Sequence, residues 1–219
     1  MFDVRILEIS GSKHTLPYRT PIKFGGRVVT EATIVNMSVT VETRDGRTGK
    51  GQGSMPMGVV WAWPTDKVSG EEALDAMRLF GQQAAGYATG YDGWGHPLEI
   101  THELMADHPK IAEAIRVNKE LEEPIPKLAQ LVAASPLFAA IHDAYGKAHG
   151  QNSYNLLGKE HCNRDLSAYL TPEFAGEYLA WEFRPGETLL HIGHAPGVVI
   201  ERGNVIASPG QIHHQPSAA

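Results

Sequence analysis

A run of β-branched residues followed by an Asp-Gly pair is the feature that most constrains the fold of this chain. Residues 32–43 alternate Ile, Val and Thr with other side chains at a period close to two, which is typical of a β-strand with one buried face. Asp45-Gly46 follows, and Asp-Gly between two strand-like runs is a strong hairpin signal. We therefore predict a strand returning over residues 48–53, with residues 4–10 as the third strand of an antiparallel meander.

Residues 69–150 carry helical periodicity instead. Ser69 can cap a helix that reaches about residue 87, because its side chain can accept a hydrogen bond from the first turn. Further helices are predicted over residues 96–106, 109–121 and 137–149, the last opened by Pro136 and ended by Gly150. Together with the meander they predict an α+β fold, in which a three-stranded antiparallel sheet packs on a helical bundle.

Two segments break both periodicities and are predicted to be loops. Residues 14–30 contain Pro17, Pro21 and Gly25-Gly26, and residues 54–64 are apolar without a strand or helix period. Near the C-terminus we expect a strand at 166–170 and a hairpin that pairs 198–200 with 205–206, whereas the last ten residues look disordered.

Composition narrows the class of protein. Nineteen Lys and Arg face 25 Asp and Glu, for a net charge of −6, and no basic cluster stands out, so we expect no nucleic-acid partner. The single cysteine, Cys162, excludes an internal disulfide framework and fits a reducing compartment. We recognise neither a signal peptide nor an apolar run long enough for a membrane span. A cytoplasmic location without a membrane partner is therefore predicted.

The stretch FAAIHDAYGKAHG at residues 138–150, followed by YNLLG at 154–158, has a recognisable pattern. It resembles the helix and turn that lead into the first barrel strand of the enolase superfamily, in its mandelate racemase/muconate lactonizing enzyme branch. Over roughly residues 3–170, the meander, the two loops and their spacing resemble that branch as well. The resemblance implies an N-terminal capping domain over residues 1–135, the first helix and strand of an incomplete βα barrel over 136–183, and an irregular tail over 184–219.

The resemblance also implies a chemistry. Full-length members abstract a proton α to a carboxylate, with a Lys or His as base and Mg²⁺ stabilising the enediolate. They are racemases, dehydratases or cycloisomerases, commonly oligomeric, and their implied substrates are small carboxylates or sugar acids. Whether this chain is itself an enzyme is left open by its sequence.

In such proteins the capping domain supplies two loops that close over the substrate. By position these loops are residues 16–26 and 54–63 here. The candidate substrate-binding residues within them are aromatic, cationic or apolar: Tyr18, Arg19, Lys23, Phe24, Met55 and Trp61. The alternative is that the aromatic members pack into the core of the capping domain itself.

The catalytic pattern of the family is not recognised in this chain. The family has a Lys-x-Lys after the second barrel strand and three acidic ligands on successive strands. Here no Lys follows Lys159, and Glu173 and Glu177 share one helix face rather than ending separate strands. His142 and Asp143 are adjacent, so their side chains diverge on a helix and cannot form a base–orienter pair. We therefore predict no catalytic residue, no metal ligand and no Mg²⁺ bound by this chain.

Two function hypotheses follow. In the first, the chain is a truncated, non-catalytic capping fragment of an enolase-superfamily isomerase or lyase, with truncation or a frame shift near residue 180, where the composition becomes rich in Gly, Pro and His. In the second, it is a stand-alone binding or oligomerisation module derived from the capping domain. A small α/β enzyme of another kind has no supporting motif: no Gly-x-Ser-x-Gly, no phosphate-binding loop and no Cys–His pair.

Overall fold

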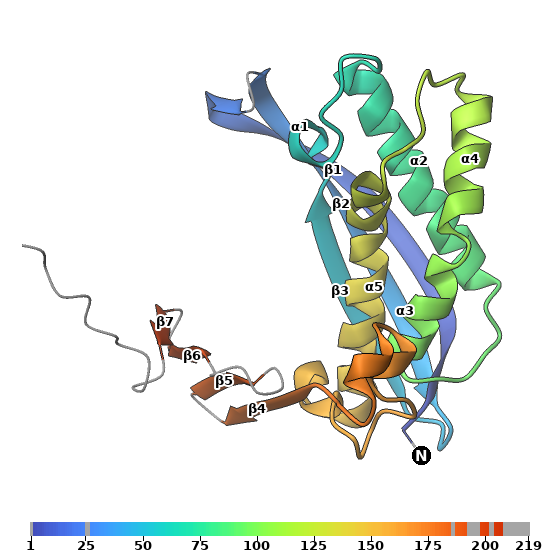
Figure 1. The fold of residues 1–219 in the computed structure, drawn as a ribbon, viewed down its shortest axis with the longest axis vertical. Helices are drawn as coiled ribbons and strands as arrows, with labels where there is room; N and C mark the ends of the chain where they lie inside the picture. Colours follow the sequence, from blue (N-terminus) through green and yellow to red (C-terminus); the bar gives the residue numbers. More distant parts are fainter. Residues whose placement is uncertain (1, 25–26, 185–186, 192–197, 202–203, 208–219) are drawn as a thin grey trace, which may run out of the picture. The chain divides into compact units, whose positions relative to one another are not determined.

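A computed structural model describes residues 2–24, 27–184, 187–191, 198–201 and 204–207, with side-chain surroundings as far as residue 179 (Figure 1). The chain divides into two compact units, Met1–Gly150 and Gln151–Ala219. The first unit is an α+β domain, as predicted. None of the helices in the described part of the chain is long and apolar enough to cross a membrane.

The first unit is built on an antiparallel sheet of strand order β1-β2-β3, namely β1 (Val4–Phe24), β2 (Arg27–Thr43) and β3 (Thr48–Pro56). The Asp-Gly hairpin between β2 and β3 is confirmed: Gly46 adopts a φ of +83°, and its N–H donates to the Thr43 carbonyl at 2.9 Å. Glycine adopts a positive φ without the steric cost that other residues would have, which explains its place in this turn.

The loop predicted over residues 14–30 is wrong. β1 and β2 stay paired as far as Phe24 opposite Arg27, whereas β3 ends at Pro56 opposite Ile34. Residues 15–24 and 27–33 therefore form a two-stranded ribbon that extends beyond the third strand (Figure 1), and we call it the distal ribbon. The prolines do not end the pairing; they coincide with a register shift between Pro17 and Ile22. Gly25-Gly26 lies outside the described residues.

Five helices follow the sheet: α1 (Val59–Ala62), α2 (Gly70–Thr89), α3 (Pro97–Met105), α4 (His108–Asn118) and α5 (Lys127–His149). α1 replaces part of the apolar loop predicted over 54–64. The cap at Ser69 is confirmed as a reciprocal capping box, because its hydroxyl accepts from the Glu72 N–H at 3.2 Å and the Glu72 carboxylate accepts from the Ser69 N–H at 3.0 Å. Gly150 ends α5 in the left-handed conformation, as expected.

α5 is one continuous helix, in which Pro136 lies in the interior instead of opening a new helix. A proline at this position cannot donate to the carbonyl of Val132. The hydroxyl of Ser135 donates to that same carbonyl at 2.8 Å, so the freed acceptor keeps a partner. The boundary predicted between residues 135 and 136 therefore falls inside a helix.

Over residues 49–53, β3 carries only glycine on the face that α5 covers. Gly49, Gly51 and Gly53 alternate along the strand and are buried. A Cβ on Gly51 would lie 2.8 Å from the Cα of Ala144 and closer still to the Ala140 carbonyl oxygen. Small residues repeat along the helix opposite these glycines: Pro136, Ala140, Ala144 and Ala148. The two elements meet backbone to backbone, which side chains on either surface would prevent.

The helix motif that resembles the enolase superfamily secures this contact. The Asp143 carboxylate accepts a hydrogen bond from the backbone N–H of Gln52 at 2.8 Å and pairs with Lys147 at 2.7 Å, one helical turn away. Asp143 thus holds β3 against α5, and within the first unit its role is structural.

The second unit begins with three short 3₁₀ helices, at Ser153–Leu156, Leu166–Ala168 and Pro172–Phe174. The strand predicted at 166–170 is therefore wrong. Asp165 caps the turn instead, accepting from the N–H groups of Ser167 at 3.1 Å and Gly176 at 2.7 Å. The Ser167 side chain also donates to Asp165, and this hydrogen bond has the largest part in lowering the pKa of Asp165, followed by the one from Gly176.

The backbone after residue 179 forms a four-stranded antiparallel sheet in sequence order. Its strands are β4 (Ala180–Arg184), β5 (Glu187–His191), β6 (Val198–Glu201) and β7 (Asn204–Ala207). The hairpin predicted from 198–200 and 205–206 is confirmed, with Val199 opposite Ile206. Where we expected an irregular tail, the described part is thus strand. The last ten residues, predicted to be disordered, lie outside the described residues.

Candidate functional site

A groove of about 870 Å³ lies between the distal ribbon and the segment that runs from the end of β3 through α1 to the start of α2. We call it the ribbon groove. Its volume is within the range of roughly 300–1,000 Å³ that small-molecule sites occupy. Its strand wall includes Tyr18, Ile22 and Phe24, and its other wall includes Val60 and Trp61.

The aromatic candidates from both predicted loops line this groove. Tyr18 is 41% exposed, Phe24 52% and Trp61 41%, so none of them belongs to the buried core. The alternative in which these rings pack into the core is therefore wrong. Ile22 and Val28 add apolar surface that is half exposed or more. Soluble proteins rarely expose so many large apolar side chains in one patch, and such a patch is typical of a binding site.

Trp61 is held in place by the local backbone. The single turn of α1 begins after Gly58, whose carbonyl accepts from the Trp61 and Ala62 N–H groups at 3.3 and 3.0 Å. The indole lies directly against the Cα of Gly58: a Cβ there would lie 2.8 Å from the indole Cδ1 and closer to Nε1. Glycine at this position is what allows the ring to lie over the turn.

Arg27 connects the two walls of the groove, and the sequence analysis did not single it out. Its guanidinium donates to the carbonyl of Thr65 and lies 3.6 Å from the Asp66 carboxylate, so the ribbon is attached to the segment that precedes α2. The available signal was the apolar residues at 22 and 24, before Gly25-Gly26, and at 29, after it. Strands on both sides of the glycines would have placed Arg27 on a strand.

The other three candidates do not line the ribbon groove. Lys23 lies between Ile22 and Phe24, so strand alternation turns it to the opposite face of the ribbon. Arg19 is exposed within the stretch where the register shifts. Met55 shares the face of β3 that α5 covers. The structure thus brings together the aromatic candidates and separates them from the predicted cationic ones.

Over the residues that the structure describes, no cluster of three or more His, Cys, Asp or Glu side chains could hold a metal ion. These residues therefore do not fit the Mg²⁺ site that the family resemblance implies for full-length relatives. His142 is half-buried, and burial together with the nearby His96 lowers its pKa to about 4. Residues 184–219 contain four histidines, and three of them, His194, His213 and His214, lie outside the described residues.

Comparison with known proteins identified no matching family model and no matching curated protein sequence. Several solved structures are similar. L-talarate/galactarate dehydratase from Salmonella typhimurium LT2 shares 20% identity at a TM-score of 0.42, over 71% of this chain and 33% of that one. L-talarate dehydratase from Polaromonas sp. JS666, complexed with Mg and L-glucarate, shares 20% identity at a TM-score of 0.34, over 67% and 33%.

A third similar structure is a mandelate racemase/muconate lactonizing protein from Herpetosiphon aurantiacus, with 17% identity and a TM-score of 0.32 over 66% of this chain and 32% of that one. The matched part is thus about a third of the length of each of these proteins. The name of the third structure includes the branch that residues 138–158 resemble.

Proposed function

We propose that the first unit of this chain is a capping domain of the mandelate racemase/muconate lactonizing enzyme type, and that the ribbon groove covers part of a small carboxylate or sugar-acid substrate. The observation that carries the proposal is the groove itself, where Tyr18, Phe24 and Trp61 stay exposed along its two walls. Aromatic rings at the mouth of an active site exclude water and select among substrate side chains.

The capping domain contributes no catalytic group in this proposal. α-Proton abstraction on Mg²⁺ would be supplied by a βα barrel, and the groove would contribute apolar contacts and closure. The resemblance of residues 138–158 supports the family assignment, and the helix-to-strand contact made by Asp143 explains why that pattern belongs to the capping domain fold.

The proposal can be tested with the purified chain in D₂O and Mg²⁺, using L-talarate, galactarate and L-glucarate as probes. We expect no α-proton exchange in the ¹H NMR spectrum of the sugar acids. In protein NMR spectra, chemical-shift changes at millimolar ligand should centre on the groove. Exchange at the α-carbon would refute the non-catalytic role, and shift changes centred elsewhere would refute the assignment of the groove.

A matched pair of variants makes this test specific. Tyr18 and Tyr87 are almost equally exposed, at 41% and 39%, but only Tyr18 lines the groove. Tyr18→Ala should weaken the ligand-induced shifts, whereas Tyr87→Ala, on α2, should leave them unchanged. Equal effects of the two substitutions would contradict a role for the ribbon.

The second hypothesis, a stand-alone binding module, is supported by a different observation. β1 has a free edge beside α2, and this edge has its own groove.

A further inference from the structure

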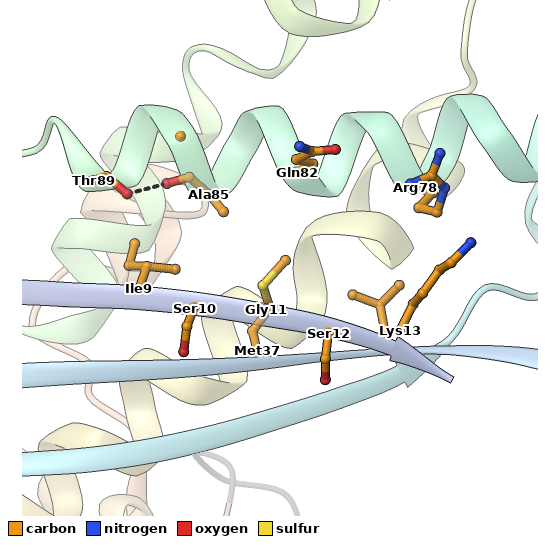
Figure 2. Close-up of a pocket in the computed structure, with 12 residues that line it drawn as sticks. Ile9, Ser10, Gly11, Ser12, Lys13, Met37, Arg78, Gln82, Ala85 and Thr89 are labelled. Atoms are coloured by element: carbon orange, nitrogen blue, oxygen red, sulfur yellow. Dashed lines mark hydrogen bonds between the residues drawn. The ribbon is translucent and has the colours of Figure 1, made fainter. Parts of the chain in front are cut away.

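A second groove, of about 470 Å³, lies between β1 and α2, and we call it the β1–α2 groove. Its strand side consists of five consecutive residues of β1, 9–13, together with Val35 and Met37 of β2. Its helix side is one face of α2, with residues spaced by about one, two and three turns: Arg78, Gln82, Ala85, Gly86 and Thr89. Figure 2 shows α2 running alongside β1 across this groove. A groove that runs along a strand and one face of a helix is long and narrow, so it can hold an extended segment of chain.

The edge of β1 that faces this groove is unpaired along residues 9–13. β1 pairs with β2 on its other side, and in the described part of the chain the free side carries one isolated bridge, between Val4 and Gly95. That bridge has both of its backbone hydrogen bonds, at 3.0 and 3.1 Å, so this side of β1 is already oriented to accept an antiparallel neighbour. Unpaired N–H and C=O groups on an edge strand are a template for another strand.

Small and apolar residues keep the groove open. The Met37 sulfur fills the space beside Gly11, where a Cβ would lie 2.8 Å from it, whereas a Cβ on Gly86 would meet no atom within 4 Å. In Figure 2 the side chains of Ile9 and Met37 extend toward α2, whereas those of the serines at 10 and 12 point away. The floor is therefore apolar, and the polar groups nearest to an occupant along β1 belong to the backbone.

The charge of the groove has one sign. Among the described residues that line it, Lys13 and Arg78 carry charge, and both are cationic. They extend toward the same end of the groove in Figure 2. Arg78 pairs with Asp75 at 2.7 Å, whereas Lys13 forms no ion pair within the described part of the chain. A carboxylate is the group that would complement this end.

We propose that the β1–α2 groove binds an extended acidic peptide, which adds to the free edge of β1 as a further strand. Backbone hydrogen bonds would hold the peptide, alternate apolar side chains would lie on Ile9 and Met37, and a carboxylate would meet Lys13 and Arg78. Five strand residues correspond to roughly 17 Å, so about five peptide residues would be in contact. This site shares Lys13 with the lining of the ribbon groove, but it does not depend on the proposed capping function.

The test uses the full chain and a fluorescein-labelled ten-residue peptide, with Val and Thr at its centre and Glu near each end, so that either strand direction brings a carboxylate to Lys13. Fluorescence anisotropy should show saturable binding. The same peptide with Lys in place of Glu, and a version with alternate backbone nitrogens methylated, should each bind at least tenfold more weakly. Equal binding of the methylated peptide, or no binding at millimolar peptide, would overturn the proposal.

Two variants locate the site on the protein. Gly86→Leu places a side chain into open space in the groove and favours the helix, so it should keep the thermal midpoint of unfolding while reducing affinity at least tenfold. Lys13→Glu should also reduce affinity at least tenfold, whereas Lys50→Glu, an equal charge change at an exposed position of β3 outside the groove, should not. Unchanged binding by Gly86→Leu would show that the peptide binds elsewhere and would refute the proposal.

Discussion

Replacing Gly51 by alanine tests the close contact between β3 and α5. The new Cβ would lie 2.8 Å from the Cα of Ala144 and even nearer to the Ala140 carbonyl, where contact normally begins near 3.4 Å. Both neighbours are backbone atoms of one helix and cannot rotate away, so α5 would have to shift or the strand would have to separate from it. Overpacking typically costs about 1–3 kcal/mol. Losing the Asp143 hydrogen bond to the neighbouring Gln52 N–H adds about 1 kcal/mol.

We therefore expect Gly51→Ala to lower the free energy of unfolding by about 2–4 kcal/mol and the thermal midpoint by roughly 10 °C. Urea denaturation followed by tryptophan fluorescence measures it, since Trp63 is only 1% exposed. Gly86→Ala is the matched control: its Cβ meets nothing within 4 Å, so removing a helix glycine should stabilise the protein by about 0.5–1 kcal/mol. A Gly51→Ala protein within about 0.5 kcal/mol of the wild type would refute the packing argument.

Four further substitutions probe single interactions, each by urea denaturation. Asp143→Ala should cost about 1–2 kcal/mol because β3 loses a hydrogen bond, whereas Lys147→Met, which removes only an exposed ion pair, should cost about 0.5 kcal/mol or less. Ser69→Ala should cost about 1 kcal/mol through loss of the capping box, and no change would contradict that cap. The pKa of His142 falls from 6.5 to about 4 on folding, so the unfolded state binds the proton first and stability should decrease as the pH falls from 6.5 to 4. This loss is about 3 kcal/mol, and His142→Gln should remove it; an unchanged pH profile would contradict the assignment.

The parts of the fold that the sequence predicts correctly are those governed by local signals. The Asp45-Gly46 turn, the Ser69 cap and the Gly150 terminus each depend on residues within one turn of one another. Where the outcome depends on a distant partner, local signals mislead. Pro136 looks like a helix start because the hydroxyl of Ser135, which takes over the freed carbonyl, is not part of any propensity scale.

The candidate site divides in the same way. The two segments predicted as loops indicate the aromatic rings of the ribbon groove, because large apolar side chains in turn-rich segments are unusual. For the cationic candidates, Arg19 and Lys23, charge is the only signal in the sequence. Their direction depends on strand register, which Gly25-Gly26 and two prolines conceal, and the register instead places Arg27 across the groove.

The contact that Gly49, Gly51 and Gly53 of β3 make with α5 also has a mechanical consequence. With backbone against backbone, β3 and α5 have no layer of side chains between them that could slide, and we expect these two elements to move as one rigid block. β1 and β2 leave that block where β3 ends, beyond Ile34, and continue as a two-stranded arm. We therefore expect the arm to bend where it loses the support of the third strand, at the end of β3. Amide hydrogen exchange should change abruptly at that point, slow in the three-stranded part and fast along the arm.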